Sequence, residues 1–366
     1  MAHRVFITGA AGYIGGMLCD QFTQRDDVEA VIALDTAPMP ALLRGNRKIV
    51  WIAANTADPA WRARAAAERP DVVIHAAWRI RESYGRQTSG ENVAGAGNVF
   101  DFAFATPSVR RLLHFSTVSA YGAEADNTIE RRFTEADPLR VTGFRYGDDK
   151  RLAEQHLQDR FARARAAGSQ VAVAVLRPAA VTGPRGRNQR VLFGLQAALA
   201  GQLKRTAVER TVALLMSFIP VTPRWCRQFV HEDDVADIAA LLAFAELPAP
   251  YATFNIGPPG AVMRAADMAL AFGKRPLRIH PQLIRLAFFL AWHGTRGRIP
   301  TARGTWKSYS YPIVVDGAKP TAVYGYRYRM DSREAFTKNT GRYAQPIAQR
   351  AAARAHPECE PSGART

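Results

Sequence analysis

The chain has 366 residues, of which 48% are hydrophobic and 22% charged, and this ordinary globular composition excludes fibrous and wholly disordered proteins. Its formal net charge of +17 at pH 7 favours anionic ligands, but no zinc-finger or RNA-binding signature accompanies the charge, so we expect no specific nucleic-acid partner. Cys19, Cys226 and Cys359 have no paired spacing and the apolar runs are short, which together predict a cytoplasmic protein without a transmembrane segment.

The first strand and turn are typical of a nucleotide-binding unit. An apolar strand at Val5–Ile7 is followed by Gly9, Gly12 and Gly15, and a helical pattern begins at about Tyr13. Glycine lets the backbone approach a pyrophosphate and lets the helix pack closely on the sheet, while the helix N-terminus offers free N–H groups to the phosphates. The strand–turn–helix context makes this spacing more specific than glycines alone.

Asp35 ends the next predicted strand, "EAVIALD", about 20 residues after the last glycine of the turn. A carboxylate at this place accepts the hydroxyls of an adenosine ribose and repels a 2′-phosphate. Thr36 follows with no adjacent arginine, so the sequence favours NAD over NADP. The alternative is an ordinary aspartate at a strand end.

Strand-like and helix-like segments continue to alternate. We expect further strands within 71–78, 110–122 and 169–184 and helices within 91–104 and 146–167. Near-continuous apolar strands between helices predict an α/β fold with a doubly wound parallel sheet, the Rossmann type.

A smaller, mainly helical substrate domain is expected from the C-terminal segments, which include apolar helical patterns at 191–205 and 281–294. Trp306, Tyr309 and Tyr311 could line its pocket or form its core. The predicted organisation is a nucleotide-binding domain at 1–182 with return segments at about 228–257, a substrate domain at 183–227 and 258–340, and a disordered Ala/Arg/Pro-rich tail at 341–366.

Several motifs then occur in a fixed order along the chain. They are "TGAAGYIG" at 8–15, "HAAW" at 75–78, "NVAGAGNV" at 92–99, "STVSAYG" at 116–122, "YGDDK" at 146–150, "LRPAAVTGP" at 176–184 and "QFVHEDDVAD" at 228–237. Taken together, they resemble the extended short-chain dehydrogenase/reductase superfamily, in its NAD-dependent epimerase/dehydratase branch. The resemblance covers roughly residues 4–260.

A tyrosine and a lysine four positions apart share one helix face, but this spacing alone is common by chance. The resemblance implies that Tyr146 is the catalytic acid/base, that Lys150 is its partner and holds the nicotinamide ribose, and that Thr117 hydrogen-bonds the reacting substrate oxygen. It also implies NAD as the cofactor, with binding residues Gly9, Gly12, Tyr13, Ile14, Gly15, Asp35, Ala76, Ala77, Asn92, Tyr146 and Lys150.

Departures from the family pattern reduce the number of reactions that the resemblance allows. Members that eliminate water carry an Asp-Glu pair directly after the threonine, and decarboxylating members carry a glutamate two residues after it. This chain has Val118 and Ser119 there. A 4,6-dehydratase and a decarboxylase are therefore disfavoured, and epimerisation and simple oxidoreduction remain.

The substrate evidence is divided. Arg227 stands where nucleotide-sugar enzymes of the family bind the diphosphate, a task that suits a guanidinium, although it could equally be a structural arginine. Ala180 replaces an asparagine that many of those enzymes use. The leading hypothesis is an epimerase that acts on a nucleotide sugar through a transient keto intermediate. The alternatives are a dehydrogenase or reductase of a lipophilic alcohol or ketone, similar to a 3β-hydroxysteroid dehydrogenase, and a non-catalytic NAD-binding regulatory protein.

Three further expectations concern partners. The resemblance implies a homodimer formed by helices at 91–106 and 146–167. The apolar helix at 282–293, with Arg285 inside it and Arg296 and Arg298 just beyond, could make weak contact with a membrane surface. His231 and the acidic residues 232–234 are expected to form a turn and a helix start, so we predict no metal.

Overall fold

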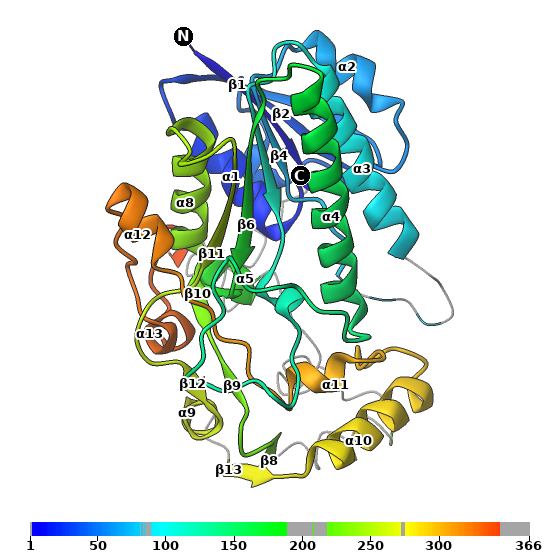
Figure 1. Ribbon diagram of the computed structural model, residues 1–366, viewed down its shortest axis with the longest axis vertical. Helices are drawn as coiled ribbons and strands as arrows, with labels where there is room; N and C mark the ends of the chain where they lie inside the picture. Colours follow the sequence, from blue (N-terminus) through cyan, green and yellow to red (C-terminus); the bar gives the residue numbers. More distant parts are fainter. Residues whose placement is uncertain are drawn as a thin grey trace, which may run out of the picture.

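The computed structural model describes residues 2–80, 82, 84, 89–188, 207, 218–271 and 275–344. Within these residues, a seven-stranded parallel sheet forms the centre of the larger lobe, with strand order β11-β6-β5-β4-β1-β2-β3 (Figure 1). Its strands are β1 (His3–Thr8), β2 (Val28–Asp35), β3 (Ile49–Ala53), β4 (Val72–His75), β5 (Arg111–Phe115), β6 (Ala172–Pro178) and β11 (Tyr251–Ile256).

Helices cover both faces of this sheet. Successive side chains of β1 point to opposite sides, so Val5 and Ile7 belong to one core and Phe6 to the other, and all three are fully buried. α1 (Tyr13–Thr23) and α8 (Glu232–Phe244) complete the first core. α2 (Trp61–Ala67), α3 (Ser89–Ala105) and α4 (Arg145–Ala166) complete the second. The predicted doubly wound α/β fold is confirmed.

A smaller lobe lies at the carboxyl ends of the strands (Figure 1). Its core includes Phe229, Met263, Ile284 and Phe288. Short strand pairs join β7 (Ala180–Thr182) to β10 (Phe229–His231), β8 (Phe218–Val221) to β13 (Arg275–Arg278), and β9 (Cys226–Arg227) to β12 (Met263–Arg264). The other short elements are η1 (Ala41–Leu43), η2 (Val118–Tyr121), α5 (Pro184–Asn188), α9 (Ala265–Ala271), α10 (Pro281–Gly294), α11 (Thr305–Ser308), α12 (Lys319–Tyr324) and α13 (Ser332–Thr337).

The helix expected at 191–205 lies outside the described residues, as do residues 345–366 of the expected tail. The first residues assigned to that tail are folded: Tyr343 is 8% exposed, and its hydroxyl lies 2.9 Å from Asp20 Oδ2 on α1. The described part of the chain contains no helix with the length and apolarity needed to cross a membrane.

Candidate active site

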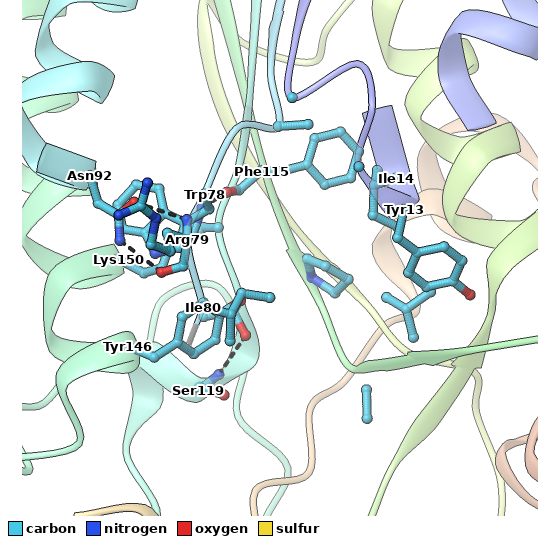
Figure 2. Close-up of a pocket in the computed structure, with 18 of the residues that line it drawn as sticks. Tyr13, Ile14, Trp78, Arg79, Ile80, Asn92, Phe115, Ser119, Tyr146 and Lys150 are labelled. Carbon is cyan, nitrogen blue, oxygen red and sulfur yellow. Dashed lines mark hydrogen bonds between the residues drawn. The ribbon is translucent and has the colours of Figure 1, made fainter. Parts of the chain in front are cut away.

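A cleft of about 840 Å³ lies between the two lobes, at the carboxyl ends of the parallel strands. Residues after β1, β2, β4, β5 and β6 form one wall, and residues of the smaller lobe form the other. Every site residue predicted from the sequence lines this cleft, from the glycine turn through Asp35, Thr117, Tyr146 and Lys150 to Arg227. Figure 2 shows Tyr146 and Lys150 extending from the same helix into it.

The glycine turn is shaped by close backbone contacts. Gly9 has φ +75°, and a Cβ on it would lie 2.7 Å from Ala77 Cα. A Cβ on Gly15 would lie 2.1 Å from the Gly9 carbonyl oxygen, because α1 packs directly against the turn. Gly12 is the N-cap of α1, so the first N–H groups of that helix face the cleft. The turn can therefore accept a pyrophosphate against bare backbone.

Asp35 is tied to this turn. Its Oδ2 accepts a hydrogen bond of 2.9 Å from the Ala11 N–H, and its Oδ1 accepts one of 2.9 Å from the Ala37 N–H. A carboxylate has about four acceptor positions. Asp35 can therefore hold the turn and still accept ribose hydroxyls, which fits the predicted adenosine end of a dinucleotide.

Tyr146 and Thr117 face each other near the middle of the cleft. The Thr117 side chain caps η2 by accepting from the Ser119 N–H at 3.2 Å, and it is also hydrogen-bonded to Tyr146. Burial raises the pKa of Tyr146, and the bond with Thr117 opposes this shift.

Lys150 is 3% exposed and is held by two contacts. Its Nζ donates to the Phe115 carbonyl oxygen and lies 3.7 Å from the centroid of the Trp78 ring. Burial lowers the pKa of Lys150 to about 7, and the nearby Glu154 carboxylate opposes that shift. Lys150 can therefore change protonation state near neutral pH, which suits a group beside a proton-transfer step.

Behind Lys150, one helical turn further along α4, a buried ion pair supports the site. Glu154 is 2% exposed and forms a salt bridge of 2.6 Å with Arg177 of β6. Glu154 also accepts from Ser116, and Arg177 donates to the Tyr121 hydroxyl at 2.7 Å. Apart from the four-residue spacing of Lys150 and Glu154, no sequence pattern indicates this network.

Two predicted cofactor residues have positioning contacts of their own. The Asn92 amide accepts from the Arg79 N–H and donates to the Arg79 carbonyl, both at 2.9 Å, and so fixes the loop after β4. The Tyr13 hydroxyl donates to Glu232, which is fully buried and also accepts from the Arg185 N–H at 2.9 Å. Asn92 thus holds cleft-lining backbone in place, and Tyr13 links the start of α1 to the start of α8.

The substrate end of the cleft is mixed in character. The Arg227 guanidinium lies 5.4 Å from the Tyr309 ring centroid, and Trp292 and Tyr311 also line this end. For Trp306 the sequence allowed either pocket lining or core packing, and its side chain packs with the core of the smaller lobe.

Glu82, which the sequence did not indicate as a site residue, also lines the cleft. Its carboxylate lies 3.6 Å from Arg145, and burial raises its pKa. No sequence motif surrounds this residue, so only its position in the fold identifies it.

His231 and the acidic residues after it form a helix start. His231 caps α8 by accepting from the Asp233 N–H at 3.2 Å. Asp234 accepts from the Tyr326 hydroxyl and the Arg329 N–H, and Asp233 accepts from the Arg342 N–H. Among the described residues, no group of three or more side chains has a metal-binding arrangement.

Several known proteins are similar to this chain in sequence or in fold. An uncharacterized protein of Mycobacterium tuberculosis strain H37Rv is 29% identical over 293 residues, which cover 75% of this chain and 67% of that protein. The Bordetella bronchiseptica enzyme WbmG, in complex with NAD and UDP, superposes with a TM-score of 0.63 at 22% identity, covering 95% of this chain and 96% of WbmG. UDP-glucose 4-epimerase of Thermotoga maritima, with UDP-glucose, gives 0.65 at 18% identity, covering 95% and 99%. These structures share the fold.

A family match gives more than the shared fold, because it identifies the family of the chain. The description "NAD dependent epimerase/dehydratase family" matches residues 5–257, well over half of the chain. That span contains the glycine turn, Asp35 and the Tyr146/Lys150 helix. The predicted family and its cofactor, NAD, are confirmed at this level: the chain belongs to the NAD dependent epimerase/dehydratase family.

Proposed function

We propose that the protein is an NAD-dependent epimerase of a nucleotide sugar. The observation that carries this proposal is the meeting of Thr117, Tyr146 and Lys150 in one cleft with the glycine turn and Asp35. A chain that only sensed a dinucleotide would need the turn and Asp35 but not the three polar groups at the other end.

The chemistry is divided between cofactor and protein. Bound NAD would supply a hydride acceptor and donor. Thr117 would donate a hydrogen bond to the reacting oxygen of the sugar, and Tyr146 would remove and return the proton of that hydroxyl. Because burial raises the pKa of Tyr146, its phenolate needs a nearby positive charge, and protonated Lys150 is placed on the same helix face to provide one.

The nucleotide-sugar assignment rests on Arg227 and on the smaller lobe. Arg227 presents a guanidinium to the cleft beside the Tyr309 ring, a combination that suits a diphosphate next to a base or sugar ring. WbmG is described with NAD and UDP, and the Thermotoga maritima enzyme with UDP-glucose. We extend that ligand class to this chain as part of the proposal.

A second candidate is a net oxidoreductase of a lipophilic alcohol or ketone. Trp292, Tyr311 and Ile313 line the substrate end and favour an apolar ligand. The two candidates differ in how they use the cofactor. An epimerase returns its hydride to the same substrate and can retain one cofactor, whereas a net oxidoreductase must exchange cofactor in every cycle.

The deciding experiment measures the nicotinamide released when freshly purified protein is denatured, followed by an assay with UDP-hexoses. Near-stoichiometric NAD together with C4 epimerisation would support the proposal. Protein without cofactor that reduces long-chain or steroid ketones in the presence of added NADH would support the second candidate. Tyr146→Phe should abolish turnover in either case. A wild-type protein that binds NAD but turns over neither class of substrate would indicate a non-catalytic NAD-binding protein.

We assign the preference for NAD over NADP to Asp35. Asp35→Asn keeps an acceptor for the Ala11 N–H but removes the negative charge. The affinity for NADP should therefore rise relative to NAD, as measured by calorimetric titration of both. A ratio identical to that of the wild type would remove Asp35 from the specificity argument.

We also propose a homodimer formed through α3 and α4, as the family resemblance implies, and a cytoplasmic location, which the free thiols of Cys19 and Cys226 support. A shallow hollow on the outer side of these helices contains the small residues Gly90, Ala94 and Gly97, which allow close helix approach. Sedimentation equilibrium of the wild type and of Ala94→Arg tests this. A dimer that Ala94→Arg leaves intact would place the interface elsewhere.

A further inference from the structure

The smaller lobe has an exposed face that the proposed function does not use. We infer that this face docks on the surface of a bilayer that contains anionic phospholipids. The α10 face, as we define it, consists of Leu283, Leu286, Phe289 and Leu290 of α10 together with the arginines Arg275, Arg278, Arg285 and Arg296.

The apolar part of the α10 face is unusual for a globular helix. α10 buries only Ile284 and Phe288 against the lobe. On its other side, Leu283, Leu286 and Leu290 follow an i, i+3, i+7 spacing and are 57%, 53% and 59% exposed, with Phe289 at 58% beside them. A helix that is apolar on two sides normally has partners on both. One side of α10 therefore lacks a partner among the described residues.

The charge of the segment between Asp267 and Asp316 indicates which kind of partner the exposed side of α10 would contact. Between Asp267 and Asp316 the sequence contains no Asp or Glu but eight Lys or Arg residues. Arg275, Arg278, Arg285 and Arg296 are all exposed, and none forms a salt bridge with a described carboxylate. Exposed apolar side chains on a segment that also carries exposed, uncompensated arginines match the boundary between acyl chains and anionic headgroups.

The same charges argue against two other occupants. An isologous contact with a second copy would place this acid-free segment against itself, so its arginines would repel one another. A nucleic acid would satisfy the arginines but would leave the leucines against a charged backbone. A bilayer satisfies both groups at once.

Because of where α10 lies, docking through the α10 face would also determine where the cleft lies relative to the bilayer. β13 and α10 lie along the end of the molecule farthest from the N-terminus (Figure 1). Trp292, near the C-terminal end of α10, lines the cleft. A protein docked through the α10 face would therefore hold the substrate end of its cleft next to the bilayer.

The experiment is co-sedimentation of the full chain with vesicles of phosphatidylcholine alone and of phosphatidylcholine with about 30% phosphatidylglycerol, at about 0.1 M salt. We expect at least about tenfold stronger binding to the anionic vesicles, and loss of most of that binding at high salt. Equal binding to both vesicles, or binding to neither, would overturn the proposal without the need for any variant.

Variants then locate the contact. Leu286→Gln/Leu290→Gln and Arg275→Glu/Arg278→Glu should each weaken binding by about tenfold or more. The matched controls, Leu42→Gln/Val323→Gln and Arg44→Glu/Arg47→Glu, change exposed residues on other elements by the same chemistry and should bind like the wild type. Circular dichroism and NAD affinity should be unchanged in all four.

Two outcomes would assign the α10 face to another partner. If the leucine variant changes the sedimentation equilibrium mass, the face is an interface between copies. If a short DNA duplex binds instead of vesicles and the leucine variant binds it equally well, the face is a nucleic-acid site. Neither outcome alters the cofactor-release test, so failure of this proposal is distinguishable from failure of the proposed function.

Discussion

The ammonium group of Lys150 lies 3.7 Å from the centroid of the Trp78 ring, and the two residues come from different strand–helix units of the sheet. The ring covers an ammonium group that also donates a hydrogen bond to the Phe115 carbonyl oxygen. Trp78 thus stabilises the protonated form of the lysine in a place where burial disfavours it.

Replacing Trp78 should therefore weaken the site without unfolding it. Trp78→Leu removes the ring and should lower turnover by about two- to thirtyfold, as expected for a lost cation–π contact of about 0.5–2 kcal/mol. Trp78→Phe keeps an aromatic face and should lose less. Steady-state rates with the accepted substrate test this, and equal losses in the two variants would show that ring charge distribution plays no part.

The stability of the cofactor-free protein should depend on pH through Lys150. An unfolded lysine keeps its proton up to a pKa of about 10.4, whereas burial lowers the folded pKa to about 7. Between these values the unfolded chain binds more protons, so the free energy of unfolding should rise with pH across this window. Urea unfolding between pH 7 and 9 should show this rise in the wild type but not in Lys150→Met. If the free energy of unfolding changed with pH in the same way in both proteins, the lowered pKa would not belong to Lys150.

Glu154 should affect both the stability of the fold and the pKa of Lys150. Glu154→Gln leaves Arg177 buried without its counter-ion and should destabilise the protein by about 3 kcal/mol. The exposed pair partner Glu29 provides the control, since Glu29→Gln should cost less than about 1 kcal/mol. Because Glu154 raises the pKa of Lys150, its loss should also shift the alkaline limb of the pH–rate profile to lower pH. A purely structural role would leave that limb unmoved.

The Gly9 turn predicts a contrast between two glycines of similar backbone geometry. Gly9 and Gly45 have φ +75° and +77°, but a Cβ on Gly9 would meet the Ala77 backbone at 2.7 Å, whereas one on Gly45 has nothing within 4 Å. Gly45→Ala should cost only about 1–2 kcal/mol of backbone strain. Gly9→Ala should cost more and should also lose NAD binding in calorimetry. Normal NAD affinity in Gly9→Ala would show that the turn does not hold the cofactor.

The parts of the site that were predictable from the sequence are those with local determinants. The glycine turn, Asp35 at the end of β2 and the Tyr146/Lys150 spacing each lie within one strand–helix unit, so their motifs carry the geometry with them. The ion pair of Glu154 with Arg177 and the contact of Trp78 with Lys150 join units that become neighbours only after the strand order is set. The direction of the Tyr146 pKa shift could not be predicted from the sequence either, because it depends on how deeply the folded chain buries the side chain.

The order of the strands also affects how the chain can fold during synthesis. The helices on one face of the sheet are complete by residue 166, but α8 and β11, which complete the other core, come from residues 232–256. A nascent chain that has emerged only to residue 182 therefore carries a half-covered sheet, with the apolar side of α1 lacking its packing partner. The core of the nucleotide-binding lobe therefore cannot be completed until residues 232–256 have been made, and residues 183–227, which the sequence assigns to the substrate domain, are synthesised before them.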